Sequence, residues 1–75
     1  MGAVKFPKGS EKWQMFVDYW ALCQAFWEPE SGEEYWQNVI NGTNEFCQKY
    51  RDPYANALAE AFTHDLDRRY NKKIR

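Results

Sequence analysis

Residues 10–27 read SEKWQMFVDYWALCQAFW, and the rest of this 75-residue chain has to pack around them. At about 100° per residue, the apolar side chains of this stretch fall on two neighbouring stripes of one helix. The first, called the tryptophan stripe below, contains Trp13, Phe16, Val17, Trp20, Cys23 and Trp27. The second, called the methionine stripe, contains Met15, Tyr19, Leu22 and Phe26.

Together the two stripes span roughly 220° of the helix, whereas a surface helix needs an apolar stripe of roughly 100°. The additional apolar surface has to be covered. In a bundle, one stripe would pack on a second helix and the other on a third, and Trp20→Ala would cost about 3–5 kcal/mol as a core truncation. Otherwise part of the methionine stripe or of the tryptophan stripe stays open to a partner.

The ends of this first helix are marked by local signals. Ser10 is a good N-cap, and Pro29 disfavours a helical conformation at the residue before it. The sequence therefore predicts a helix over about 11–27, preceded by an arm over residues 1–9 from which Phe6 can fold back onto the core.

A second helix is predicted over about 32–50. Ser31 and Glu34 match the S-x-x-E capping box. Gly42 is the weak point, because glycine costs about 1 kcal/mol relative to alanine inside a helix, and the helix could break there. The face predicted to point inward contains Tyr35, Trp36, Val39, Ile40, Thr43, Phe46, Cys47 and Tyr50.

A third helix is predicted over about 53–72. Asp52 can cap it, and Pro53 suits its first position. Its apolar stripe contains Ala55, Leu58, Ala59, Phe62, Leu66 and Tyr70. The short connection over 28–32 favours antiparallel packing of the first two helices. The predicted fold is thus all-α, a compact three-helix bundle in a single domain over residues 1–75.

The two cysteines are predicted to be reduced and largely buried. In an antiparallel register, Cys23 lies level with Gln37 and Cys47 with Trp13, which separates the thiols by about 15 Å along the axis. A disulfide needs Cα atoms within about 7 Å. The chain has no apolar run long enough for a membrane span and no signal-peptide core, so a cytoplasmic protein is expected.

Catalytic and metal-binding patterns are weak throughout the sequence. His64 is the only histidine and has no second ligand pair at metal spacing, so we interpret it as a surface residue. Cys23 and Cys47 lie on apolar stripes without an adjacent base. The sequence contains no phosphate-binding glycine loop and no GxSxG motif. We expect no enzyme activity, no metal and no cofactor.

Charge is unevenly distributed along the chain. Residues 1–67 hold five basic and eleven acidic residues, a net charge of −6, and residues 68–75 hold five basic residues. The acidic cluster, called the acidic connection below, contains Glu28, Glu30, Glu33 and Glu34. It is either a solvated loop that complements a helix dipole or a patch that faces a basic surface.

Two stretches, FPKGSEKWQMFVDYW at 6–20 and AFTHDLDRRYNKK at 61–73, carry a resemblance. With them the chain resembles small, uncharacterised helical proteins of phages and mobile elements in Gram-positive bacteria. It is similar in style to anti-CRISPR proteins, being very short, acidic in its body and without catalytic residues. The resemblance implies an inhibitor of a host defence factor and assigns no residue roles.

The leading hypothesis is a non-enzymatic protein-binding module, such as a phage or mobile-element inhibitor of a CRISPR nuclease, that binds a host protein with a basic surface. The alternative is a small DNA-associated regulatory protein that uses Arg68, Arg69, Lys72 and Lys73, although a pI of about 5.7 argues against it. No membrane contact is expected, and the chain is expected to be a monomer or a homodimer. The residues predicted to bind the partner are Glu28, Glu30, Glu33 and Glu34, with Met15, Tyr19, Leu22 and Phe26.

Overall fold

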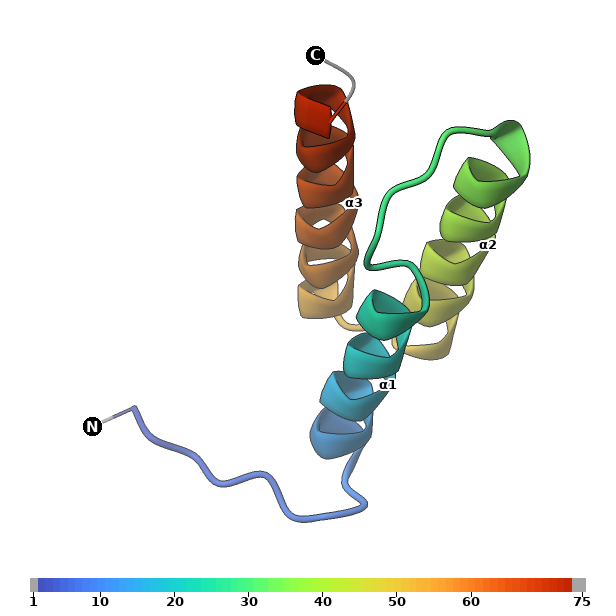
Figure 1. Ribbon diagram of the computed structural model, residues 1–75. Coiled ribbons are helices and arrows are strands. Elements are labelled where there is room, and N and C mark those ends of the chain that lie inside the picture. Colours follow the sequence, from blue (N-terminus) through green and yellow to red (C-terminus); the bar gives the residue numbers. More distant parts are fainter. Residues whose placement is uncertain (1, 74–75) are drawn as a thin grey trace.

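A computed structural model describes residues 2–73, of which Lys73 is described by its backbone alone. It contains three helices, α1 (Glu11–Ala25), α2 (Glu33–Lys49) and α3 (Pro53–Lys73), and no strand among the described residues (Figure 1). All three helices contact one another, which confirms the predicted all-α three-helix bundle. Arg75, the last of the basic tail residues, lies outside the described residues.

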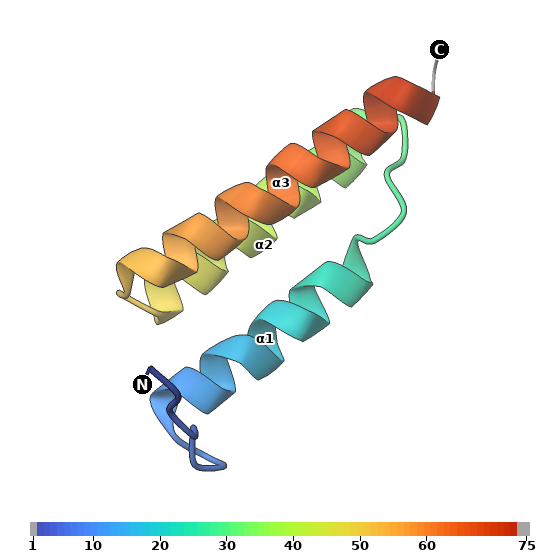
Figure 2. The ribbon, with the colours of Figure 1, turned by 90° about the vertical axis from the view of Figure 1, so that its left-hand side faces the viewer.

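Helices α2 and α3 are antiparallel and make the most contacts of any pair of helices; they meet near the turn that joins them and diverge towards their other ends (Figure 1). A short turn over residues 50–52 joins them. Helix α1 is shorter, lies along one side of this pair and runs antiparallel to α2 (Figures 1 and 2). Residues 26–32 continue from the end of α1 along the pair to the start of α2. One side of α1 therefore faces the pair, and the opposite side has no helix against it.

The core consists of two clusters of buried side chains. Near the turn between α2 and α3, the cluster contains Met15, Phe46, Tyr50, Ala55 and Ala59. Towards the other end, the cluster contains Val39, Phe62 and Leu66. Tyr19 and Leu22 of α1 pack against both clusters. The methionine stripe is thus the side of α1 that meets both α2 and α3.

Gly42 lies inside an uninterrupted α2, so the helix does not break there. A Cβ atom at this position would lie 3.1 Å from Leu22 Cδ1 and 3.2 Å from Phe26 Cε2. These distances are tighter than ordinary van der Waals contact. The glycine therefore lets α1 approach α2 closely, and this contact offsets its low helix propensity.

Two of the predicted helix caps are confirmed and one is wrong. The Ser10 Oγ accepts a hydrogen bond from the Trp13 amide at 3.3 Å, and Asp52 Oδ1 accepts one from the Tyr54 amide at 3.0 Å. The predicted capping box of Ser31 and Glu34 does not form. The N-cap of α2 is Gly32, which has φ of 143° and makes no side-chain cap bond. Glycine tolerates this backbone angle, and α2 begins directly after it.

A polar contact ties α1 to the end of α2. The Asp18 carboxylate accepts hydrogen bonds from Lys49 Nζ at 2.7 Å, from Gln14 Nε2 at 2.9 Å and from the Tyr50 hydroxyl. The bond from Lys49 is the main reason that the pKa of Asp18 lies below its ordinary value. Lys12 and Asp52 form a further ion pair between the start of α1 and the α2–α3 turn. These contacts fix the position of α1 along the pair.

The cysteines are free, as predicted, although both are half-buried rather than largely buried. No helix among residues 2–73 combines the length and the apolar character needed to cross a membrane.

Candidate protein-binding surface

The tryptophan stripe of α1 is largely open to solvent. Trp20 is 68% exposed, Trp27 51%, Val17 40% and Phe16 36%. The expectation that Trp20 is a core residue is therefore wrong. Helix α1 meets α2 and α3 mainly with the methionine stripe. From the tryptophan stripe, Cys23 packs against the core and Phe16 contacts Tyr54 of α3, but no element covers Trp20.

The open side chains form a continuous hollowed surface. One groove of about 730 Å³ is lined by Phe16, Tyr19, Trp20, Cys23, Gln24 and Trp27. A second, of about 400 Å³, is lined by Phe6, Trp13, Phe16, Val17 and Trp20. Phe16 and Trp20 belong to both grooves, so the two adjoin. We call this surface the α1 face and define it by Trp13, Phe16, Val17, Trp20, Cys23, Gln24 and Trp27.

The N-terminal arm extends the α1 face. The Phe6 ring stacks on Phe16 with 5.8 Å between centroids and 18° between planes. Phe6 is itself exposed. On its other side, Phe16 meets the edge of the Tyr54 ring of α3 at 6.0 Å. Phe6 thus folds back onto α1, as predicted, but it packs on the outer side of the helix and not on the core.

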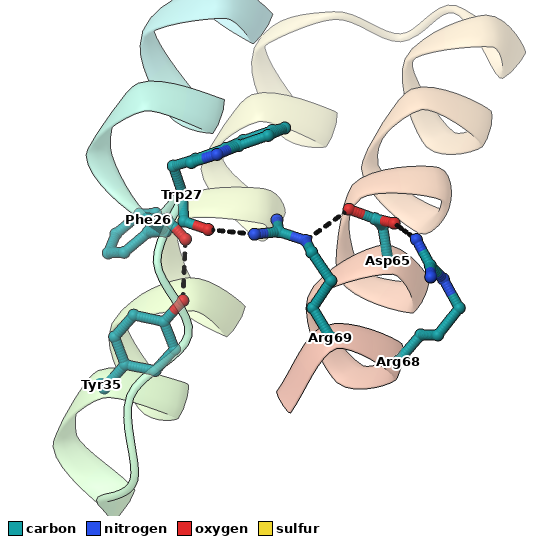
Figure 3. Close-up of polar contacts among 6 residues, drawn as sticks. All are labelled: Phe26, Trp27, Tyr35, Asp65, Arg68 and Arg69. Atoms are coloured by element: carbon teal, nitrogen blue, oxygen red, sulfur yellow. Dashed lines mark hydrogen bonds and ion pairs between the residues drawn. The ribbon is translucent and has the colours of Figure 1, made fainter. Parts of the chain in front are cut away.

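Trp27, at the far end of the α1 face, is held by α3. The Arg69 guanidinium lies 4.3 Å from the Trp27 ring centroid, and its Nη1 donates to the Trp27 carbonyl oxygen at 2.7 Å (Figure 3). Its Nε donates to Asp65 Oδ2 at 2.8 Å. A cation over the face of a tryptophan ring is attracted by the ring quadrupole. Trp27 therefore has a fixed orientation although half of it is exposed.

The backbone beside Trp27 is also held from α2. The Tyr35 hydroxyl donates to the Phe26 carbonyl oxygen at 2.8 Å, so two successive carbonyls at the end of α1 are bonded from two helices (Figure 3). Burial raises the pKa of Tyr35 above its ordinary value. Arg68 and Arg69 both bond the Asp65 carboxylate and lower its pKa. The end of the α1 face is thus preorganised.

Of the methionine-stripe residues that were predicted to contact a partner, Met15 lies in the interior, whereas Tyr19 also lines the larger groove of the α1 face. Met15 is 1% exposed, and Tyr19, Leu22 and Phe26 are partly buried against the core clusters. Of the two stripes, the tryptophan stripe is the more open to a partner. The sequence offered no means to choose between them, because both are equally apolar and lie on the same helix.

The acidic connection is fully at the surface. All four of its glutamates are exposed, and none takes part in an ion pair among the described residues. Glu33 and Glu34 border a hollow with Trp36, Gln37 and Ile40, and Ile40 is 50% exposed although it was predicted to point inward. The acidic connection therefore adjoins a second, smaller apolar surface on α2.

The basic residues at the end of α3 are partly engaged within the protein. Arg68 and Arg69 both pair with Asp65, and Arg69 also holds Trp27. Lys72 is exposed, and the side chain of Lys73 lies outside the described residues. Of the three side chains that the structure describes, two are therefore already paired with a carboxylate of the protein itself.

Reactive groups are scattered. His64 is exposed, and no group of three or more His, Cys, Asp or Glu side chains within residues 2–73 is arranged to hold a metal ion. Burial raises the pKa of both the Cys23 and the Cys47 thiol, which leaves less of the reactive thiolate at neutral pH. Burial also raises the pKa of Tyr19 to about 12.

No protein-family model matches the chain, and comparisons with curated proteins and with solved structures likewise return no significant match.

Proposed function

We propose that this protein is a non-enzymatic protein-binding module. The observation that carries the proposal is the α1 face, on which Trp20 and Trp27 are more than half exposed beside Phe16 and Val17. Soluble monomers rarely leave a continuous apolar surface of this kind uncovered. Tryptophan is also among the residues that contribute most to binding energy at protein interfaces.

The arrangement of the α1 face favours binding over a purely structural role. Its side chains other than that of Trp27 project from α1, and Trp27, just beyond the helix, is oriented by Arg69 and by the bonded carbonyls beside it. A preorganised surface loses less conformational entropy on binding than a mobile one. The core, by contrast, is completed by the methionine stripe without any contribution from Trp20.

In its most specific form, the proposal is a phage or mobile-element inhibitor of a host defence factor such as a CRISPR nuclease. It would act by occupying a surface that the factor needs, without chemistry of its own. The exposed and unpaired glutamates of the acidic connection support a target with a basic surface, because complementary charge accelerates association and favours the correct partner.

The alternative, a DNA-associated regulator, is less well supported. Two of its four candidate contacts, Arg68 and Arg69, are already engaged with Asp65. A gel-shift titration at increasing salt tests it, because phosphate contacts release counterions and give affinities that fall steeply with salt. Binding that weakens in this way and is lost on Lys72→Glu would favour the regulator over the inhibitor.

The protein-binding proposal is tested by differential capture. Host lysate is passed over the immobilised wild-type protein, over Trp20→Glu and over Ile40→Glu, and the retained proteins are identified by mass spectrometry. Ile40 is 50% exposed and lies in the hollow beside the acidic connection, so its variant tests the second candidate surface. We expect one host protein retained by the wild type and lost with at least one variant, and its activity inhibited by the wild-type protein. Identical retention on all three would contradict the proposal.

A further inference from the structure

The side chains of the α1 face recur along the sequence at regular intervals. Trp27 follows Trp20 by seven residues but lies beyond Ala25, the last residue of α1. Within α1, Trp13 and Trp20 are seven residues apart, and Phe16 and Cys23 follow them at an interval of three. This is the a and d pattern of a helix that packs along a second helix. Within the chain, no helix packs along this pattern: Cys23 reaches the core and Phe16 touches Tyr54, but Trp20 is 68% exposed.

The same residues are arranged symmetrically about Trp20. Trp13 and Trp27 lie seven residues to either side of it, Phe16 and Gln24 four, and Val17 and Cys23 three. A two-fold interface requires one surface that complements itself when it is reversed. If a second α1 lay antiparallel on the first with the axis at Trp20, the start of each helix, with Trp13, would lie beside the end of the other, which Trp27 follows.

Charge at the two ends of α1 also favours the reversed arrangement. Before and at the start of the helix lie Lys5, Lys8 and Lys12, and after its end lies the acidic connection. Lys5 and Lys8 are exposed, as are Glu28 and Glu30. An antiparallel pair places the basic end of each copy beside the acidic end of the other, whereas a parallel pair would place like charges together.

We propose that a second copy of this chain covers the α1 face, as an antiparallel, two-fold pair of α1 helices centred on Trp20. The inference rests on the proposed function, since it names the protein that the α1 face binds. Figure 2 shows that α1 forms an outer side of the bundle. A second copy on the α1 face would also border Tyr54 and Arg69 of α3, which contact Phe16 and Trp27. Glu33 and Glu34, with the Trp36 and Ile40 hollow, remain available for the target.

The exposed apolar area of the α1 face is large enough for a weak dimer. Because a whole aromatic residue offers about 150–250 Å², the exposed parts of the α1 face and Phe6 amount to roughly 500 Å² per copy. A pair would bury roughly 1,000 Å², which is near the lower bound for a specific interface. We therefore expect a dissociation constant in the micromolar range rather than a permanent dimer.

Sedimentation velocity across a protein series from low micromolar to several hundred micromolar tests the pairing. We expect the wild type to shift from monomer to dimer and to stop there, because a two-fold interface is closed. Trp20→Glu should raise the dissociation constant at least 100-fold while circular dichroism stays unchanged. Ile40→Glu, with the same charge change at a similarly exposed position, should still dimerise. A wild type that remains monomeric throughout, or an Ile40→Glu variant that fails like Trp20→Glu, would overturn the pairing.

The antiparallel direction is tested by exchanging charges. Lys5→Glu with Lys8→Glu should weaken the dimer about tenfold at low salt, and so should Glu28→Lys with Glu30→Lys. The chain that carries all four changes should recover the wild-type affinity, since opposite charges again meet. Failure of the combined chain to recover would contradict an antiparallel pair, because only that arrangement brings these two ends together.

Failure of the pairing and failure of the proposed function give different results. A monomeric wild type that captures a host protein through the α1 face overturns the second copy as its occupant and leaves the binding module standing. A dimer that captures no host protein and inhibits none supports the pairing and overturns the inhibitor.

Discussion

The two stripes of α1 are alike in composition and opposite in environment. The methionine stripe is in the core, where Met15 is almost fully buried, whereas the tryptophan stripe leaves Trp20 and Trp27 more than half exposed. Both are apolar and both follow the period of the helix. The comparison teaches that hydrophobic periodicity identifies which side chains can be buried, while the number of neighbouring elements decides which of them are.

The largest expected difference between the two stripes is the loss of stability when Met15 is truncated. Met15→Ala should lower the free energy of unfolding by about 2–5 kcal/mol, because it removes buried atoms where α1 meets Phe46 and Tyr50 and leaves a cavity. Chemical denaturation monitored by tryptophan fluorescence measures the loss. A loss below about 1 kcal/mol would mean that the methionine stripe does not hold α1 in place.

The close approach of α1 to α2 is tested at Gly42. Gly42→Val should destabilise the protein by about 1–3 kcal/mol, because its branched side chain would enter the space held by Leu22 and Phe26. Asn41→Ala, an exposed neighbour on the same helix, is the control and should change stability by less than about 0.5 kcal/mol. Equal melting temperatures for the two variants would contradict the close contact.

The polar link between the same helices is tested through pH. The folded-state pKa of Asp18 is lowered, so its charged form stabilises the fold above the unfolded pKa of about 3.9, and this contribution is lost as pH falls through the folded value. Asp18→Asn should therefore cost about 1–2 kcal/mol at neutral pH and less in acid. Urea denaturation from pH 7 to pH 2.5 measures both. A cost that is constant over this range would show that the carboxylate charge contributes nothing.

The smallest effect is expected at Trp20. Trp20→Ala should change the free energy of unfolding by less than about 1 kcal/mol, because the side chain is 68% exposed and lies outside both core clusters. The free energy of unfolding should be measured at low micromolar protein concentration, where self-association contributes little to stability. A loss comparable to that of Met15→Ala would place Trp20 in the core and remove the basis for the α1 face.

Much of the fold was predictable from local signals. The Ser10 cap, the Asp52 cap and the period of the α3 stripe are properties of neighbouring residues, and they depend little on distant contacts. The capping box at Ser31 failed for a related reason, since Gly32 accepts a backbone angle that lets α2 begin without a side-chain bond. The same local signals could not show that Arg69 reaches Trp27 across 42 positions of sequence.

The sequence by itself determined three helices, their approximate ends and the two apolar stripes of α1, because periodicity and capping act within a few residues. It also placed four glutamates together in the acidic connection. Only the tertiary structure decided which stripe is covered. That choice depends on α2 and α3 packing against each other and on Gly42 admitting Leu22 and Phe26, so that one side of α1 meets both helices and the tryptophan stripe remains open.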